Sequence, residues 1–311
     1  MKYLFTFLMI GLVCSLSQAQ EQNENTMGSL YKTSQGKAEI LGVYNEKLSS
    51  LSITSEERDI STRFGSTHVI VTGDSTKPPM IVVHGSNGCA PIALETYKGL
   101  LTDYRIYAID VLAQPNKSAE TRLSMKDESY GVWMNEVIDE LGFDSVSMAG
   151  FSFGGLVILK TLEHDERKVK EVFLTAPAYI VNGNPIKALF KVFIPMKRYM
   201  RTENREYVEK FLSSLFSQRD EFAVNYLSKV FLEFEMDFTP VPTIKSEKAQ
   251  QIKTPITLFA AENDVLFPGG KMIKRASRIF PSLVRCELLP NSKHVQNEED
   301  NALICDRIMG S

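Results

Sequence analysis

The stretch Val146-Ser-Met-Ala-Gly-Phe-Ser-Phe-Gly-Gly-Leu-Val157 joins a short apolar run to a helix-compatible segment through a turn that is rich in glycine. Gly150, Ser152 and Gly154 fit the pattern Gly-x-Ser-x-Gly, in which a strand turns sharply into a helix and lifts one serine above the sheet. The turn strains the serine backbone, so its neighbours two positions away must be almost free of side chain. Gly155 is expected to let the helix pack close to the strand. Because an ordinary strand–loop–helix connection can also match this short pattern, the other segments must decide.

The composition is that of an ordinary globular protein. The chain has 311 residues, of which 43% are hydrophobic and 23% are charged, so it can bury one large core with or without an insertion. The net charge is -3, and the chain contains no long basic run. This charge pattern disfavours a nucleic-acid partner.

The first nineteen residues are typical of a secretory signal peptide. Lys2 precedes an apolar run at 3–13 that is too short to span a bilayer, and Ser17-Gln-Ala19 supplies small residues for cleavage. An uncleaved membrane anchor is the alternative, whereas bulky Val13 disfavours a lipoprotein signal around Cys14. We expect cleavage after Ala19, export to the periplasm or the medium, and no stable membrane anchor in the mature chain.

Three cysteines remain after cleavage, at positions 89, 286 and 305. An odd number of cysteines with this spacing is unlike a disulfide framework or a zinc site. Cys286 lies in an apolar strand-like run and Cys305 in a helical one, so buried free thiols are expected. The sequence signals neither a metal nor an organic cofactor.

Beyond a polar segment at 20–35, which predicts a flexible lead-in, residues 36–311 are expected to form a single domain. A helical spacing is followed by two strands with a tight turn between them, and then by strand-like runs that alternate with helical segments of ten to fifteen residues. The expected strands lie at 58–64, 67–72, 80–84, 104–110, 171–175, 255–261 and 284–289, with one more in the apolar run that begins at Val146 and meets Gly150. This alternation predicts an α/β fold with an eight-stranded, mostly parallel, doubly wound sheet.

The alternation breaks between residues 185 and 246. This insertion shows no convincing strand but three helical stretches, at 185–200, 203–217 and 221–236, and it holds eight of the 18 phenylalanines. Most of these rings are expected to form the core of a small helical subdomain. A minority are expected to line an apolar pocket above the sheet.

A serine becomes a good nucleophile when a base takes its proton and a third group orients that base. Asp264 follows one predicted strand and His294 follows the next, which gives the order Ser152, Asp264, His294. This order is one known solution to the triad geometry. Glu262 is a weaker candidate for the acid. Of the four histidines, only His294 lies in a loop directly after a terminal strand.

The tetrahedral intermediate of such a reaction needs backbone donors aimed at its oxyanion. The amide of Phe153, next to the nucleophile, is expected to be one donor. The other is expected from the loop after His84-Gly85, where the amide of Ser86 is the first choice and that of Asn87 the second.

These pieces together resemble the α/β-hydrolase superfamily over essentially all of the mature chain. The resemblance rests on His84-Gly85, on Gly150-Phe-Ser-Phe-Gly-Gly155, on Glu262-Asn-Asp264 and on Ser292-Lys-His294. Residues 62–70 further resemble small bacterial carboxylesterase-like members. The resemblance implies that the insertion, at about 180–250, is a helical cap.

Two positions depart from the pattern of that superfamily. Related enzymes often have Asp-x-x-Gly-x-Gly-x-Ser after the strand that ends at Asp110, whereas this chain has no glycine between Asp110 and Ser118. Lys293 stands where glycine is common. Neither departure removes a candidate catalytic group.

Ester hydrolysis through an acyl-enzyme on Ser152 fits these residues best, with His294 activating the water that releases the acid. The apolar insertion favours a small-molecule ester with a hydrophobic part. Amide or peptide hydrolysis, perhydrolysis and carbon–carbon bond hydrolysis use the same groups, and a non-catalytic binding protein can share the fold. Dehalogenases of the superfamily use an aspartate nucleophile, so the serine argues against that reaction.

Overall fold

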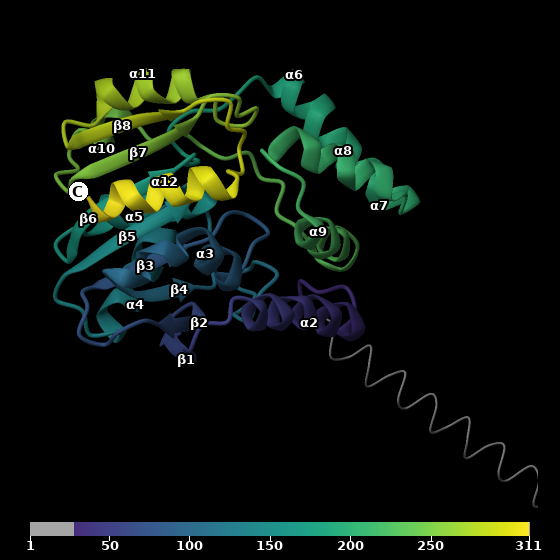
Figure 1. Ribbon diagram of the computed structural model, residues 1–311, viewed down its shortest axis with the longest axis horizontal. Coiled ribbons are helices and arrows are strands. Elements are labelled where there is room, and N and C mark those ends of the chain that lie inside the picture. The colour runs from purple at the N-terminus through teal and green to yellow at the C-terminus, as the bar shows by residue number, and fades with distance from the viewer. Residues whose placement is uncertain (1–27, 311) are drawn as a thin grey trace, which may run out of the picture.

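Eight strands form one twisted sheet through the centre of the computed structural model, which describes residues 28–310 (Figure 1). The strands are β1 (Ser55–Thr62), β2 (Gly65–Thr72), β3 (Pro79–Val83), β4 (Arg105–Ile109), β5 (Val146–Phe151), β6 (Val169–Thr175), β7 (Ile256–Ala261) and β8 (Leu283–Leu289). Their order in the sheet is β1-β2-β4-β3-β5-β6-β7-β8. β1 and β2 pair antiparallel with their neighbours, and all the other pairs are parallel. The predicted eight-stranded, mostly parallel sheet is confirmed.

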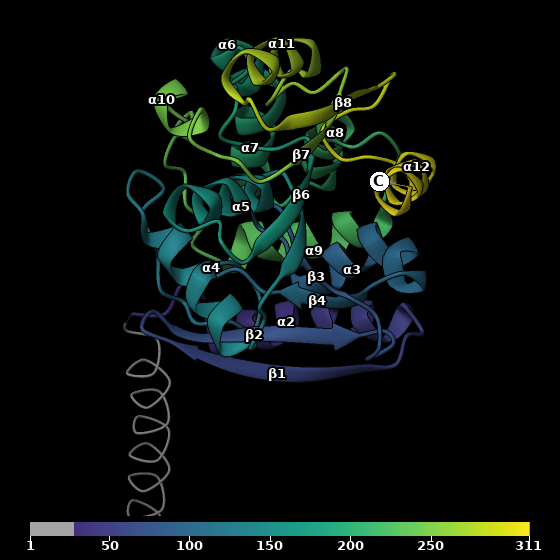
Figure 2. The ribbon, with the colours of Figure 1, turned by 90° about the vertical axis from the view of Figure 1, so that its left-hand side faces the viewer.

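Helices cover both faces of the sheet and close two apolar cores (Figure 2). One core packs against α4 (Ser129–Glu140), α5 (Phe153–His164), α10 (Ser246–Ala249) and α11 (Gly269–Ile279). The other packs against α2 (Ser34–Ser50), α3 (Ala90–Tyr97), the 3₁₀ helix η1 (Lys98–Thr102) and α12 (Glu298–Met309). Strands buried between two helical layers read as continuous apolar runs, which is why the sequence at β3 and β5 lacks alternation.

The predicted flexible lead-in at 20–35 is wrong from Ser29 onward, because residues 29–33 are hydrogen-bonded to the rest of the fold and α2 begins at Ser34. The backbone of Tyr31 bridges to Phe234, and its buried hydroxyl donates a hydrogen bond of 2.9 Å to the carbonyl of Asn116. Thr33 caps helix α2 by accepting the amide of Gly36 at 2.8 Å. The predicted signal peptide and residues 20–27 lie outside the described residues.

The insertion between β6 and β7 is helical. Its elements are α6 (Pro185–Ala188), the π-helical turn η2 (Leu189–Phe193), α7 (Ile194–Thr202), α8 (Arg205–Leu215) and α9 (Glu221–Glu233). They lie together beside the sheet, with α9 next to α2 (Figure 1). We call this segment the cap. Within the described residues, every helix is too short or too polar to cross a bilayer.

The three cysteines of the described residues carry free thiols. Cys89 and Cys305 are buried, and burial raises the pKa of the Cys305 thiol to about 11, so this thiol stays protonated at neutral pH. Cys286 is only half-buried, which corrects the expectation for that residue. Cys286 lies on β8, one of the two edge strands, whose outer side has no neighbouring strand among residues 28–310.

Candidate active site

Ser152 lies at the sharp turn between β5 and α5. Its backbone has φ 53° and ψ -112°, a conformation that costs a non-glycine residue free energy. The amide of Ser152 donates to the carbonyl of Thr175 at 3.0 Å, and its own carbonyl accepts the amides of Gly155 and Ala178, both at 2.9 Å. Backbone contacts on both sides of the serine therefore hold the strained turn in place.

The glycines around Ser152 allow backbone segments to approach closely. A Cβ atom on Gly154 would lie 2.3 Å from the carbonyl oxygen of Val83, and one on Gly150 would lie 2.6 Å from Ile158 Cδ1. A Cβ on Gly155 would lie 2.4 Å from Pro177 Cβ. Gly155 thus makes room for the loop after β6, which differs from the expected contact with the preceding strand.

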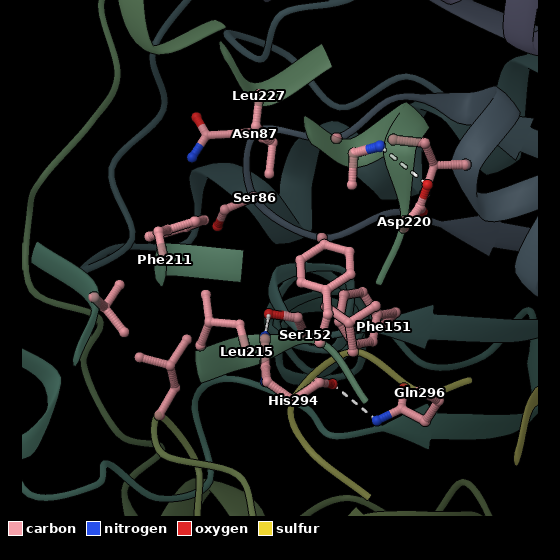
Figure 3. A pocket seen from close by; sticks show the side chains of 18 of the residues that line it. Ser86, Asn87, Phe151, Ser152, Phe211, Leu215, Asp220, Leu227, His294 and Gln296 are labelled. Atoms are coloured by element: carbon pink, nitrogen blue, oxygen red, sulfur yellow. Dashed lines mark hydrogen bonds between the residues drawn. The ribbon is translucent and has the colours of Figure 1, made fainter. Parts of the chain in front are cut away.

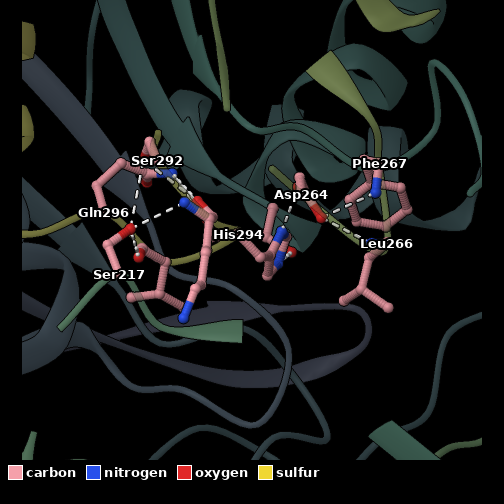
Figure 4. A network of polar contacts seen from close by, with 10 residues as sticks. Ser217, Asp264, Leu266, Phe267, Ser292, His294 and Gln296 are labelled. Carbon is pink, nitrogen blue, oxygen red and sulfur yellow. Dashed lines mark hydrogen bonds and ion pairs between the residues drawn. The ribbon is translucent and has the colours of Figure 1, made fainter. Parts of the chain in front are cut away.

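The structure brings the three predicted side chains together in one hydrogen-bonded chain (Figures 3 and 4). His294 Nε2 lies 2.9 Å from Ser152 Oγ, and His294 Nδ1 lies 2.7 Å from Asp264 Oδ2. Asp264 Oδ1 accepts the amides of Leu266 at 2.7 Å and Phe267 at 3.0 Å. All three side chains are buried. With Nδ1 donating to the carboxylate, Nε2 is free to accept the serine proton.

The rival candidates lie elsewhere. Glu262 is exposed and accepts the amide of Asn291 at 2.8 Å. His68 pairs with two carboxylates of β1, and His164 lies 3.7 Å from a carboxylate oxygen of Glu128. Asp264 is therefore the carboxylate that orients His294.

The cap holds the loop that carries His294 (Figure 4). The amide and Oγ of Ser217, just beyond α8, donate to the carbonyl of Val295 at 2.9 and 2.8 Å, and the amide of Lys293 donates to Ser217 Oγ at 2.9 Å. The ammonium of Lys293 reaches the carbonyl of Ser213 at 2.8 Å. The lysine that stands in place of glycine therefore ties the histidine loop to the cap. Sequence reasoning missed Ser217, because no local pattern marks it.

Two backbone amides near Ser152 are unengaged. Among the described residues, the amides of Ser86 and Phe153 have no hydrogen-bond partner, whereas the amide of Asn87 donates to Gln114 Oε1 at 2.7 Å. Phe153 is the first residue of α5, where helix amides lack an intrahelical acceptor and the helix dipole is positive. The first-choice donor, Ser86, is thus available to an oxyanion, and the second choice is already occupied.

The loop after Asp110 supports the oxyanion loop although it lacks the expected glycines. His84 Nδ1 donates to the carbonyl of Gly85 at 2.7 Å, and His84 Nε2 accepts the amide of Val111 at 3.0 Å and lies 3.3 Å from Asn116 Nδ2. Burial lowers the pKa of His84 to about 4, so the ring is neutral at neutral pH. Sequence reasoning missed Gln114 and Asn116, which stand at the two glycine places when the pattern is counted back from Ser118, whereas Ala113 and Pro115 stand there when it is counted from Asp110.

Asp110 and Ser118 fix the two ends of that loop. Asp110 Oδ1 accepts the amide of Ala90 at 2.6 Å, and Oδ2 accepts the hydroxyl of Tyr44 at 2.9 Å. Burial raises the pKa of this carboxyl to about 6. Ser118 Oγ donates to the carbonyl of Asp110 at 2.7 Å. The carboxyl group thus connects α2, the start of α3 and the loop.

A cavity of about 1150 Å³ lies between the cap and the sheet, with Ser152 and His294 in its wall (Figure 3). Six of the eight insertion phenylalanines line it, namely Phe193, Phe211, Phe216, Phe222, Phe231 and Phe238. The expectation that only a minority line a pocket was wrong, although Phe211 and Phe231 also belong to the buried core beneath the cap. The lining also has a polar part, where Lys47 pairs with Glu95 at 2.5 Å.

Within residues 28–310, no group of three or more His, Cys, Asp or Glu side chains gathers to hold a metal ion.

Comparison with known proteins gives a consistent assignment. Residues 78–236 match the family described as alpha/beta hydrolase fold. "Uncharacterized carboxylesterase nap" of Bacillus subtilis (strain 168) is 27% identical over 286 residues, which cover 86% of this chain and 89% of that protein. "Carboxylesterase YbfK" of the same organism is 24% identical over 86% of this chain and 90% of its own length. The crystal structure of naproxen esterase (carboxylesterase NP) from Bacillus subtilis superposes with a TM-score of 0.78 at 26% identity, covering 89% of this chain and 98% of that one. The two relatives are named carboxylesterases, which is the class of protein that residues 62–70 resemble. Because the family match covers more than half of the sequence, the chain belongs to the α/β-hydrolase fold family.

Proposed function

We propose that the chain is a serine carboxylesterase that cleaves an ester with a hydrophobic part through an acyl-enzyme on Ser152. The observation that carries the proposal is the hydrogen-bonded chain from Ser152 through His294 to Asp264, which lies in the wall of a largely apolar cavity. Further support comes from two curated relatives that are named carboxylesterases and match over 86% of this chain.

The geometry accounts for each step of this reaction. Ser152 Oγ attacks the ester carbonyl carbon while His294 Nε2 takes the hydroxyl proton, and Asp264 stabilises the imidazolium. The oxyanion accepts the free amides of Ser86 and Phe153. Collapse breaks the bond to the alcohol, which leaves with the proton from His294. A water activated by His294 then attacks the acyl-enzyme and releases the acid.

The size and lining of the cavity predict a preference for longer acyl chains. Along a series of p-nitrophenyl esters from acetate to octanoate, kcat/KM should rise by at least about 100-fold, because each buried methylene contributes about 0.8 kcal/mol. Initial rates below KM measure this ratio for each ester. A steady fall with chain length would contradict an apolar acyl site.

A matched pair of variants tests whether the cavity itself sets this preference. Leu227→Trp fills space in the lining and should remove most of the gain with octanoate while acetate is cleaved at the unaltered rate. Leu232→Trp makes the same change on α9 at a half-buried position outside the lining, and should keep the gain. Equal behaviour of the two variants would mean that the acyl chain binds elsewhere.

The hydrogen bond between Gln114 and the amide of Asn87 is expected to position the oxyanion loop. Gln114→Ala removes the acceptor and should lower kcat on p-nitrophenyl butyrate by about tenfold at nearly constant KM, because only oxyanion alignment suffers. Gln114→Glu keeps an acceptor oxygen and should restore most of the rate. A wild-type kcat for Gln114→Ala, measured under saturating substrate, would rule out this positioning role.

A further inference from the structure

The cap turns an apolar side to solvent along α6 and η2. Ile186, Leu189, Phe190 and Phe193, which we call the cap stripe, are 65%, 47%, 62% and 40% exposed. Their spacing places them on one side of a helical segment. In the described part of the chain only three other large apolar side chains are this exposed, namely Phe238, Val284 and Leu288.

The segment that carries the cap stripe is rich in basic residues. The segment 185–202 contains five cations and no carboxylate, in a protein whose net charge is -3. The cations are Lys187, Lys191, Lys197, Arg198 and Arg201. Lys187 and Lys191 are exposed, and within residues 28–310 neither makes an ion pair. The acidic residues nearest in sequence are Glu171 before the segment and Glu203 directly after it.

We propose that the cap stripe and its flanking lysines dock the protein onto a bilayer that carries anionic lipid. Exposed aliphatic and aromatic side chains enter the boundary between headgroups and acyl chains, while lysines beside them pair with lipid phosphates. A second copy of the chain is a poorer occupant, because a two-fold contact would bring two basic segments together. The combination of apolar exposure and uncompensated positive charge therefore selects an anionic lipid surface.

The docking surface is continuous with the catalytic cavity. Phe193 of the cap stripe also lines the cavity. Ala188 and Val192 lie in the same segment outside the stripe, and they line the cavity too. Phe238, which lies 4.5 Å under the Lys197 ammonium, lines it as well. An ester dissolved in the bilayer can thus enter from the docked side. This consequence for the substrate rests on the proposed esterase function, whereas the docking itself does not.

Vesicle flotation tests the docking without any need for activity. The chain from Gln20, carrying Ser152→Ala, is mixed with vesicles of phosphatidylcholine alone or with about one-third phosphatidylglycerol. We expect it to float with the anionic vesicles only, and less as salt is raised, because salt screens exposed charges. Lys187→Glu/Lys191→Glu should lower the partition coefficient about 30-fold or more, since each basic residue near an anionic surface contributes about fivefold. Ile186→Ser/Phe190→Ser should lower it at least about tenfold.

Two variants match these changes at exposed sites outside the segment 185–202. Lys274→Glu/Arg278→Glu on α11 and Val284→Ser/Leu288→Ser on β8, all outside that segment, should float as the parent does. Equal losses in the control variants, or equal flotation with both kinds of vesicle, would overturn the proposal. So would a lipid-free dimer, seen by light scattering, that Ile186→Ser/Phe190→Ser converts to a monomer. Hydrolysis of soluble p-nitrophenyl butyrate by the Ser152 forms of the same variants separates a failure of docking from a failure of the esterase assignment.

Discussion

Ser152→Ala should lower kcat on p-nitrophenyl butyrate on the order of 10⁵-fold, because the oxygen that forms the acyl-enzyme is lost. The unaltered chain should take up one equivalent of a fluorophosphonate, seen as a mass increase in the intact protein, and Ser152→Ala should take up none. The thermal unfolding midpoint should move little. The substitution removes a single hydrogen bond, to His294, which contributes about 1 kcal/mol.

Ser86→Ala is the matched control for this experiment. Ser86 lines the same cavity, but its proposed contribution is the backbone amide, which alanine retains. The Ser86→Ala protein should therefore be labelled to the same extent as the unaltered chain. Labelling that persists in Ser152→Ala would place the nucleophile elsewhere. If the folded, unaltered chain is never labelled, the hydrolase proposal is wrong.

Asp264→Asn should lower kcat by about 10⁴-fold while leaving the fold intact. The amides of Leu266 and Phe267 both donate to Oδ1, so the new side chain must keep its oxygen there and turn its NH₂ group toward His294. Nδ1 then has to accept a hydrogen bond, which moves the ring proton to Nε2. An imidazole protonated at Nε2 cannot take the proton of Ser152. The measurement is kcat with p-nitrophenyl butyrate at neutral pH.

Glu262→Gln tests whether kcat depends on the carboxylate of Asp264 in particular or on any carboxylate after β7. Glu262 lies two residues before Asp264, but it accepts the amide of Asn291 instead of orienting the histidine. Its replacement should leave kcat within about twofold, as expected for a surface side chain with one exposed hydrogen bond. If the two substitutions were equally costly, or if Asp264→Asn cost less than tenfold, Asp264 would not be the orienting acid.

The sequence alone was enough to predict the sheet and the three side chains that meet at its edge. Apolar runs and their alternation with helical spacing are local properties, and the carboxyl ends of parallel strands share one edge of the sheet. Asp264 and His294 follow such strands, so their approach to Ser152 could be expected from strand order alone. The glycines at 150 and 154 could be expected for the same reason, because they meet a local need of the turn.

Which side chains are buried, and which groups the loops contact, could be learned only from the tertiary structure. Ser86 is available to an oxyanion, and Asn87 is not, because Gln114 from another loop occupies the Asn87 amide. Tyr31 is buried because Phe234, far along the chain, bridges to it, although its own surroundings are polar. In the cap, Phe231 is buried whereas Phe190 is exposed, although both are phenylalanines on helical segments. The local sequence pattern determines which helix or strand a segment forms. The burial of its side chains depends on which distant part of the chain packs against that element, and only the folded chain decides which part that is.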